Sequence, residues 1–173
     1  MIAADGFVDD ITHQKDYVQF FDRTNDSQVY TNSFDISNCY AVISNDTLHV
    51  GIQFSNDISK SRSINSELWL YTGNDVQVWY WIFCGSLFSG GTYDSDFCSM
   101  MKLEKNEWIT ITTDYDIYYT LARDAEFVIP LKYFKHPDSI SIKYSITSGS
   151  QDNEIRGSDE MDDYLQIHTN KFE

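Results

Sequence analysis

Apolar and polar side chains alternate along many short segments of this 173-residue chain, and this alternation limits its fold more than any other feature. Every second residue is apolar from Thr47 to Phe54, and again from Ser139 to Thr147. Because successive side chains of a β-strand point to opposite faces, a period of two indicates a strand with one buried face. We therefore expect a chain built mainly from half-buried strands.

Shorter runs of the same kind, rich in β-branched and aromatic residues, predict further strands. They are Tyr17–Phe21, Asp35–Ile43, Glu107–Thr113, Ile117–Leu121, Ala125–Ile129 and Tyr164–Thr169. No segment keeps the spacing of an amphipathic helix for long. One helical turn is expected at residues 130–134, where Pro130 suits a first turn and Pro137 ends it. The polar stretch Ser148–Asp163 is expected to be the longest loop.

About ten short strands with sparse proline are typical of a two-layered β fold. We predict an all-β, two-sheet antiparallel β-sandwich of the jelly-roll or immunoglobulin-like kind. The length suits one domain spanning residues 1–173, since a chain of this size can bury a substantial core.

Residues 67–83 predict a hairpin whose strands are apolar on both sides. A two-residue turn at Gly73 and Asn74 would set its register, because glycine and asparagine tolerate positive φ angles. In that register Trp69 faces Val78. One face then carries Trp69, Tyr71, Val76, Val78 and Tyr80, and the other carries Leu68, Leu70, Trp79, Trp81 and Phe83.

The chain is strongly acidic, with 27 aspartate and glutamate residues against 12 lysine and arginine residues and a formal net charge of -15. This charge repels phosphate backbones and anionic lipids, so we expect neither nucleic acid as a partner nor direct membrane insertion. No apolar run approaches the roughly 20 residues that cross a bilayer. The carboxylates are expected either to keep the domain soluble or to supply cation sites.

Three cysteines lack the CxxC spacing of zinc sites and thioredoxin-like motifs. A disulfide between Cys84 and Cys98 would close a short loop and suit an oxidising compartment. Three buried free thiols, including that of Cys39, are an equally open alternative.

The opening segment Ala4–Ile11, with sequence ADGFVDDI, resembles the start of the ninth family of carbohydrate-binding modules and of DOMON domains. Three further pieces resemble these families in the expected order: Asp35–Ile36, Asn45–Ile52, and Ala125–Leu131 with its Glu-x-x-Ile-Pro pattern. The resemblance implies an extracytoplasmic β-sandwich, often an accessory domain with a structural calcium ion, whose relatives bind sugars or haem. Ile11 stands where these families often have tryptophan.

Met1–Ala4 is too short for a signal peptide, although the motif that follows it elsewhere follows a leader. We therefore expect a secreted or cell-surface protein whose leader is absent from this sequence, with a cytoplasmic protein as the alternative.

Calcium prefers six to eight oxygen ligands, and carboxylates near both ends of the chain could supply them if the terminal strands pair. The candidate ligands are Asp5, Asp9, Asp10, Asp162 and Asp163, with Asp159 and Glu160 nearby. The alternative is that these are solvated loop carboxylates.

Sugars are held by aromatic rings combined with a few polar groups. The candidate ligand-binding residues are Trp69, Tyr71, Trp79 and Trp81. A second possible surface combines Trp108, Tyr115, Tyr118 and Tyr119. All of these rings could instead belong to the core.

No nucleophile elbow, zinc-protease motif, P-loop or dinucleotide-binding motif occurs, so we expect no enzyme. Haem has little support, because there is no attachment motif and His49 is expected to be exposed on its strand. The leading hypothesis is a non-catalytic, secreted or surface-displayed binding module, with carbohydrate as its candidate ligand and calcium as a candidate structural ion. The alternative is a structural or adhesive domain that contacts another surface protein and has no small ligand.

Overall fold

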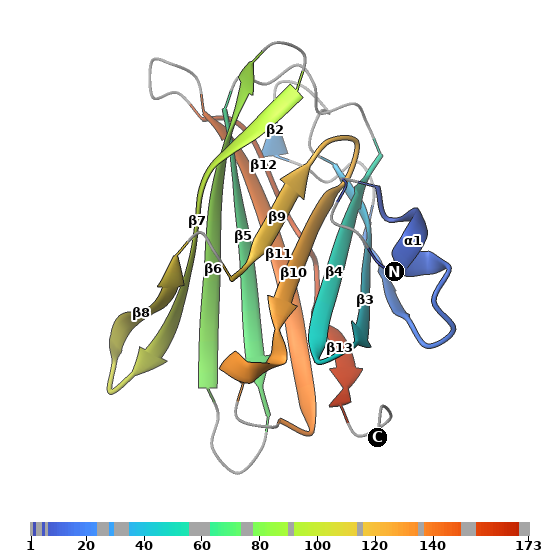
Figure 1. Cartoon of the computed structure of the whole chain (residues 1–173). Coiled ribbons are helices and arrows are strands. Elements are labelled where there is room, and N and C mark those ends of the chain that lie inside the picture. The colour runs from blue at the N-terminus through green and yellow to red at the C-terminus, as the bar shows by residue number, and fades with distance from the viewer. Residues whose placement is uncertain are drawn as a thin grey trace.

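Two antiparallel β-sheets pack face to face in this protein, which confirms the predicted β-sandwich (Figure 1). The computed structural model describes residues 2, 5, 7–23, 28–29, 35–55, 63–73, 78–89, 92–113, 116–134, 137–149 and 155–169. Within these residues the chain forms thirteen strands, one short α-helix and one 3-10 turn. None of the helices in this part of the chain is long and apolar enough to cross a membrane.

The smaller sheet has five strands. Their order is β1 (Val18–Phe21), β3 (Ile36–Ser44), β4 (Thr47–Phe54), β10 (Ala125–Pro130) and β9 (Tyr118–Leu121). The turn between β3 and β4 contains Asn45 and Asp46 at φ angles of 51° and 57°. Positive φ at two central residues is characteristic of the tight hairpin turn whose twist matches that of the strands, and asparagine and aspartate tolerate it.

The larger sheet has eight strands. Its main order is β2 (Gln28–Val29), β12 (Ile155–Glu160), β11 (Ser139–Gly149), β5 (Ser63–Thr72), β6 (Val78–Ser89), β7 (Thr92–Glu104) and β8 (Glu107–Thr113). The last strand, β13 (Leu165–His168), pairs with residues 139–142 of β11, while β12 pairs with residues 145–149 of the same strand. On the side away from β5, β11 is therefore flanked by two short strands that follow each other in the sequence.

Most strands predicted from the alternation are confirmed, and so is the helical turn, which is a 3-10 helix at Leu131–Tyr133. The predicted loop Ser148–Asp163 is wrong, because it contains β12 and the end of β11. Polar residues dominate β12, so it lacks the alternation that marks a half-buried strand, and backbone pairing with β11 holds it in place. The strands β2 and β7 and the helix α1 (Asp9–Thr12) were not predicted from the sequence.

The core lies between the sheets and is formed by the inward-pointing residues of both. Tyr144 of β11 packs across the interface against Phe54 and Phe127, with ring centroids 6.3 and 6.0 Å apart. Its hydroxyl lies 2.8 Å from Ser66 Oγ, which also lies 2.6 Å from the Tyr119 hydroxyl. These hydrogen bonds satisfy polar groups that would otherwise be costly to bury.

A disulfide joins Cys84 of β6 to Cys98 of β7, which face each other in the ladder. This resolves the alternatives left open by the sequence in favour of the bridge. Cys39 is a buried free thiol whose pKa is raised by burial.

The outer face of the five-stranded sheet is covered by the N-terminal segment that contains α1, which lies beside β3 and β4 (Figure 1). Val8 and Ile11 pack against Tyr40 and Val42 and form a second, small apolar cluster. The prediction that His49 is exposed is therefore wrong: only 7% of its surface is accessible, because α1 covers its side of β4.

Candidate functional site

Four aromatic residues of the β5–β6 hairpin share the outer face of the eight-stranded sheet. Trp69 is opposite Trp81, and Tyr71 is opposite Trp79. Alternate residues on the same strands point into the core and are buried: Leu68, Leu70, Tyr80 and Ile82.

The hairpin register predicted from a two-residue turn is wrong. Thr72 pairs with Val78, so residues 73–77 connect the strands, and residues 74–77 lie outside the described part of the chain. The two registers differ by an odd number of residues. Such a slip exchanges the faces of one strand relative to the other, and it brings Trp79 and Trp81 onto the face of Trp69.

These rings pack against one another and against two rings from other strands. Trp69 and Trp81 are stacked, with centroids 5.3 Å apart and ring planes at 11°, and Trp108 of β8 meets both edge-on at 5.9 Å. Tyr71 and Trp79 are 4.8 Å apart, and Tyr164 lies 6.4 Å from Trp79. We call this set the aromatic platform: Trp69, Tyr71, Trp79, Trp81, Trp108 and Tyr164.

Polar side chains lie beside the aromatic platform because the β-ladders bring them into neighbouring rows. Glu67 of β5 is opposite Ser145 of β11, which is opposite Glu160 of β12. Lys143 of β11 is opposite Trp69, and its Nζ lies 2.5 Å from Glu160 Oε1. The Trp81 indole Nε1 donates a hydrogen bond of 3.1 Å to Glu67 Oε2.

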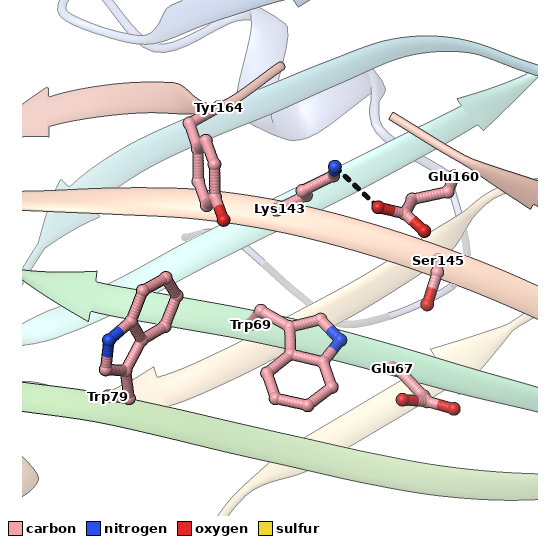
Figure 2. Close-up of a pocket in the computed structure, with 7 residues that line it drawn as sticks. All are labelled: Glu67, Trp69, Trp79, Lys143, Ser145, Glu160 and Tyr164. Atoms are coloured by element: carbon pink, nitrogen blue, oxygen red, sulfur yellow. Dashed lines mark ion pairs between the residues drawn. The ribbon is translucent and has the colours of Figure 1, made fainter. Parts of the chain in front are cut away.

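The rings and the polar groups together line a hollow of about 460 Å³ (Figure 2). Its lining residues are Glu67, Trp69, Trp79, Lys143, Ser145, Glu160 and Tyr164. Its volume lies in the usual range for small-molecule sites, and it combines three aromatic rings with four polar or charged side chains. We call it the platform hollow.

The charge on Glu67 is held in an unfavourable environment. Burial raises its pKa, the hydrogen bond from Trp81 lowers it, and the negative charge of Glu160 raises it again, with a net upward shift. A ligand group that donates to this carboxylate, or that carries a positive charge, would relieve this cost.

Two of the four predicted ligand-binding residues, Trp69 and Trp79, line the platform hollow, and Tyr71 and Trp81 flank it. Tyr164, Lys143, Ser145 and Glu67 were not predicted from the sequence, and Glu160 was named only as a possible calcium ligand. The sequence feature that could have identified Lys143 and Ser145 is the polar face of β11, where they alternate with buried isoleucines and Tyr144. That face could not be aligned with the tryptophans without the pairing of β11 and β5.

The second predicted surface is divided in the structure. Trp108 belongs to the aromatic platform, whereas Tyr119 is buried and bonded to Ser66. Tyr118 is exposed on β9 of the other sheet, and Tyr115 lies outside the described residues.

The predicted calcium site required the terminal strands to pair with each other. They do not, because β1 pairs with β3 in one sheet and β13 pairs with β11 in the other. Near the start of the chain, the Asp5 backbone N–H donates to Glu126 Oε2 at 2.8 Å, and Asp9 lies 3.5 Å from Arg123. The Gln14 side-chain amide donates to the backbone oxygen of Asp10.

The acidic residues near the end of the chain contact other groups. The Asp162 backbone N–H donates to Asp22 Oδ1 at 2.9 Å, and the Asp163 carboxylate accepts from the backbone N–H of Tyr164 at 2.8 Å. Within the described part of the chain, no cluster of three or more histidine, cysteine or acidic side chains is arranged to hold a metal ion. Calcium binding therefore stays a prediction.

Comparison of the chain with protein-family models, with curated proteins and with solved structures gave no match.

Proposed function

We propose that this domain is a non-catalytic, extracytoplasmic carbohydrate-binding module whose ligand lies on the aromatic platform and in the platform hollow. The observation that carries the proposal is the placement of Trp69, Trp79 and Tyr164 around one concavity that also contains carboxylate, ammonium and hydroxyl groups.

The chemistry of these groups suits a sugar. The C–H faces of a pyranose pack against indole and phenol rings, while its hydroxyls exchange hydrogen bonds with Glu67, Ser145 and Glu160. Trp69 and Trp79 stand on paired strands of one sheet, so their positions need little ordering when the ligand binds.

The aromatic platform extends past the hollow through the stacked pair Trp69 and Trp81 to Trp108. This extension favours an oligosaccharide, which would contact successive rings, over a single sugar.

The alternative of a structural or adhesive domain without a small ligand requires the aromatic residues to be buried and predicts no concave, ring-lined surface. The rings around the platform hollow are only partly buried, and this favours the binding module. The disulfide between Cys84 and Cys98 supports an oxidising, extracytoplasmic location.

Titration with a panel of oligosaccharides tests this function, with binding followed by tryptophan fluorescence and calorimetry. We expect saturable binding, weakened about tenfold or more by Trp69→Ala or Trp79→Ala because each removes a stacking surface. Tyr118→Ala is the matched control, since it removes an aromatic ring that is 63% exposed on the other sheet. Absence of saturable binding across the whole panel would refute the proposal.

Calcium is the second part of the proposal, and it has a separate test. Thermal melting with added calcium and with a chelator should differ, because an ion bound only by the folded state stabilises that state. Equal melting temperatures would exclude calcium without affecting the proposal for sugar binding.

A further inference from the structure

The platform hollow carries a net negative charge. Two carboxylates, Glu67 and Glu160, and one ammonium group, Lys143, line it. Lys143 and Glu160 form an ion pair and offset each other. Glu67 receives a hydrogen bond from the neutral indole of Trp81, and it has no ion pair with any residue that the structure describes. The formal sum of these three charges is therefore -1.

The rings around the hollow add to this negative potential. The faces of tryptophan and tyrosine rings attract cations within about 6 Å of the ring centroid. Lys143 already makes such a contact, because its Nζ lies 5.7 Å from the centroid of Tyr164. Trp69 and Trp79 line the same space.

The charge of the whole domain has the same sign. A formal net charge of -15 raises the local concentration of cations and repels anions. Lys143 could attract an acidic ligand, but its charge is already matched by Glu160. An acidic ligand that paired with Lys143 would leave the Glu160 carboxylate without its partner, which is costly.

We infer that the glycan bound in the platform hollow carries free ammonium groups, as in an oligomer of glucosamine, and that its charge is matched by Glu67. This inference rests on the proposed function and names its ligand class. An ammonium near Glu67 would gain an ion pair and a cation–π contact, whereas the N-acetylated sugar would gain neither.

Calorimetry with glycans of equal length tests this inference near pH 6, where the amine is protonated. The probes are a glucosamine oligomer, the corresponding N-acetylglucosamine oligomer and a uronate oligomer. We expect the glucosamine oligomer to bind about tenfold more tightly than its N-acetylated counterpart, in line with the strength of charge-assisted hydrogen bonds. The uronate oligomer should bind most weakly, and added salt should reduce the preference.

Glu67→Gln is the decisive variant because glutamine keeps an acceptor for the Trp81 indole and removes the charge. We expect it to lower affinity for the glucosamine oligomer about tenfold and to lower affinity for the N-acetylated oligomer by a clearly smaller factor, since that oligomer loses only a stronger hydrogen-bond acceptor and no ion pair. Asp46→Asn is the matched control, since it removes one negative charge in the β3–β4 turn of the other sheet. It should leave both affinities unchanged.

The outcomes separate this inference from the proposed function. If the neutral or acidic oligomer binds as tightly as the glucosamine oligomer, or if Glu67→Gln weakens all oligomers equally, the preference for a cation is wrong and the sugar platform stands. If choline alone binds as tightly as the glucosamine oligomer, the hollow recognises a cation without the sugar, and the inference is overturned. If no glycan binds, both the inference and the proposed function are refuted.

Discussion

The two outer faces of the sandwich differ in whether their apolar side chains are covered by another part of the chain. On the five-stranded sheet, the N-terminal segment covers β3 and β4 with Val8 and Ile11. On the eight-stranded sheet, no described segment covers the aromatic platform, whose rings contact one another and border the platform hollow. The chain thus closes one face with its own residues and leaves large aromatic groups accessible on the other, which is where a binding site is expected.

The outer face of the five-stranded sheet packs closely against the N-terminal segment that contains α1. Gly51 leaves room for α1, since a Cβ at this position would lie 2.6 Å from Val8 Cγ1 and 2.9 Å from Ile11 Cδ1. The buried carboxylate of Asp124, 1% exposed, accepts a hydrogen bond of 3.2 Å from the Val8 backbone N–H. Arg123 Nη2 lies 2.8 Å from the same carboxylate. This face is therefore part of the folded core.

The largest expected change in stability comes from weakening the packing of the N-terminal segment on the five-stranded sheet. Ile11→Ala should lower the free energy of unfolding by about 2–4 kcal/mol, because it removes a fully buried side chain and leaves a cavity. Urea denaturation measures this change, and calorimetry with the glycan panel should show unchanged binding. A cost below about 0.5 kcal/mol would show that the N-terminal segment is not part of the cooperative fold.

Adding a methyl group to the contact between β4 and the N-terminal segment should lower stability somewhat less. Gly51→Ala should cost about 1–3 kcal/mol, since the added methyl overlaps Val8 and Ile11. Gly73→Ala is the matched control, because a Cβ there would approach no closer than 3.7 Å to its neighbours. Similar melting temperatures for the two variants would contradict the close fit of α1.

Truncation on the open face should cost less than on the covered face, although the side chain removed is larger. Trp79→Ala should lower the free energy of unfolding by about 1 kcal/mol, mainly through lost contacts with Tyr71 and Tyr164. Denaturation curves of Trp79→Ala and Ile11→Ala, compared directly, test the ranking. If Trp79→Ala is the more destabilising, the platform belongs to the core and the contrast between the two faces fails.

Acid should weaken the covered face. Burial lowers the pKa of His49 below its ordinary value of 6.5, and the nearby charge of Asp10 only partly opposes this shift. The unfolded chain therefore binds the proton first, and the contribution of neutral His49 to stability is present above pH 6.5 and is lost as the pH falls through the folded-state pKa. Between about pH 7.5 and about pH 5.5, wild type should lose more stability than His49→Gln, whereas the exposed-site control His13→Gln should follow wild type.

The open face should show the opposite, and smallest, pH effect. The pKa of Glu67 is raised by burial and by Glu160, so the folded protein binds a proton more readily than the unfolded chain. Its contribution to stability is therefore greatest at low pH and is lost as the pH rises through the raised pKa. Glu67→Gln should slightly raise the melting temperature at neutral pH and leave it unchanged near pH 4. A lower melting temperature at neutral pH would show that the ionised carboxylate is stabilising.

Hydrophobic alternation was sufficient to predict individual strands such as β4 and β11, because one face of each is buried in a common core. It failed for the β5–β6 register, since both faces of this hairpin are apolar and no pattern penalises a slip by an odd number of residues. It also failed for His49, whose polar side chain suggested exposure. The cover over His49 comes from a segment that is distant in the sequence.

The amino-acid sequence alone therefore determined the class of fold and the aromatic residues from which a site could be built, because the period of two is a local property of each strand. Tertiary structure decided which outer face is covered and which residues meet in the platform hollow. Tyr164, Lys143 and Trp69 are brought together by strand pairing, and such pairing depends on the register between segments far apart in the chain, which no local pattern encodes.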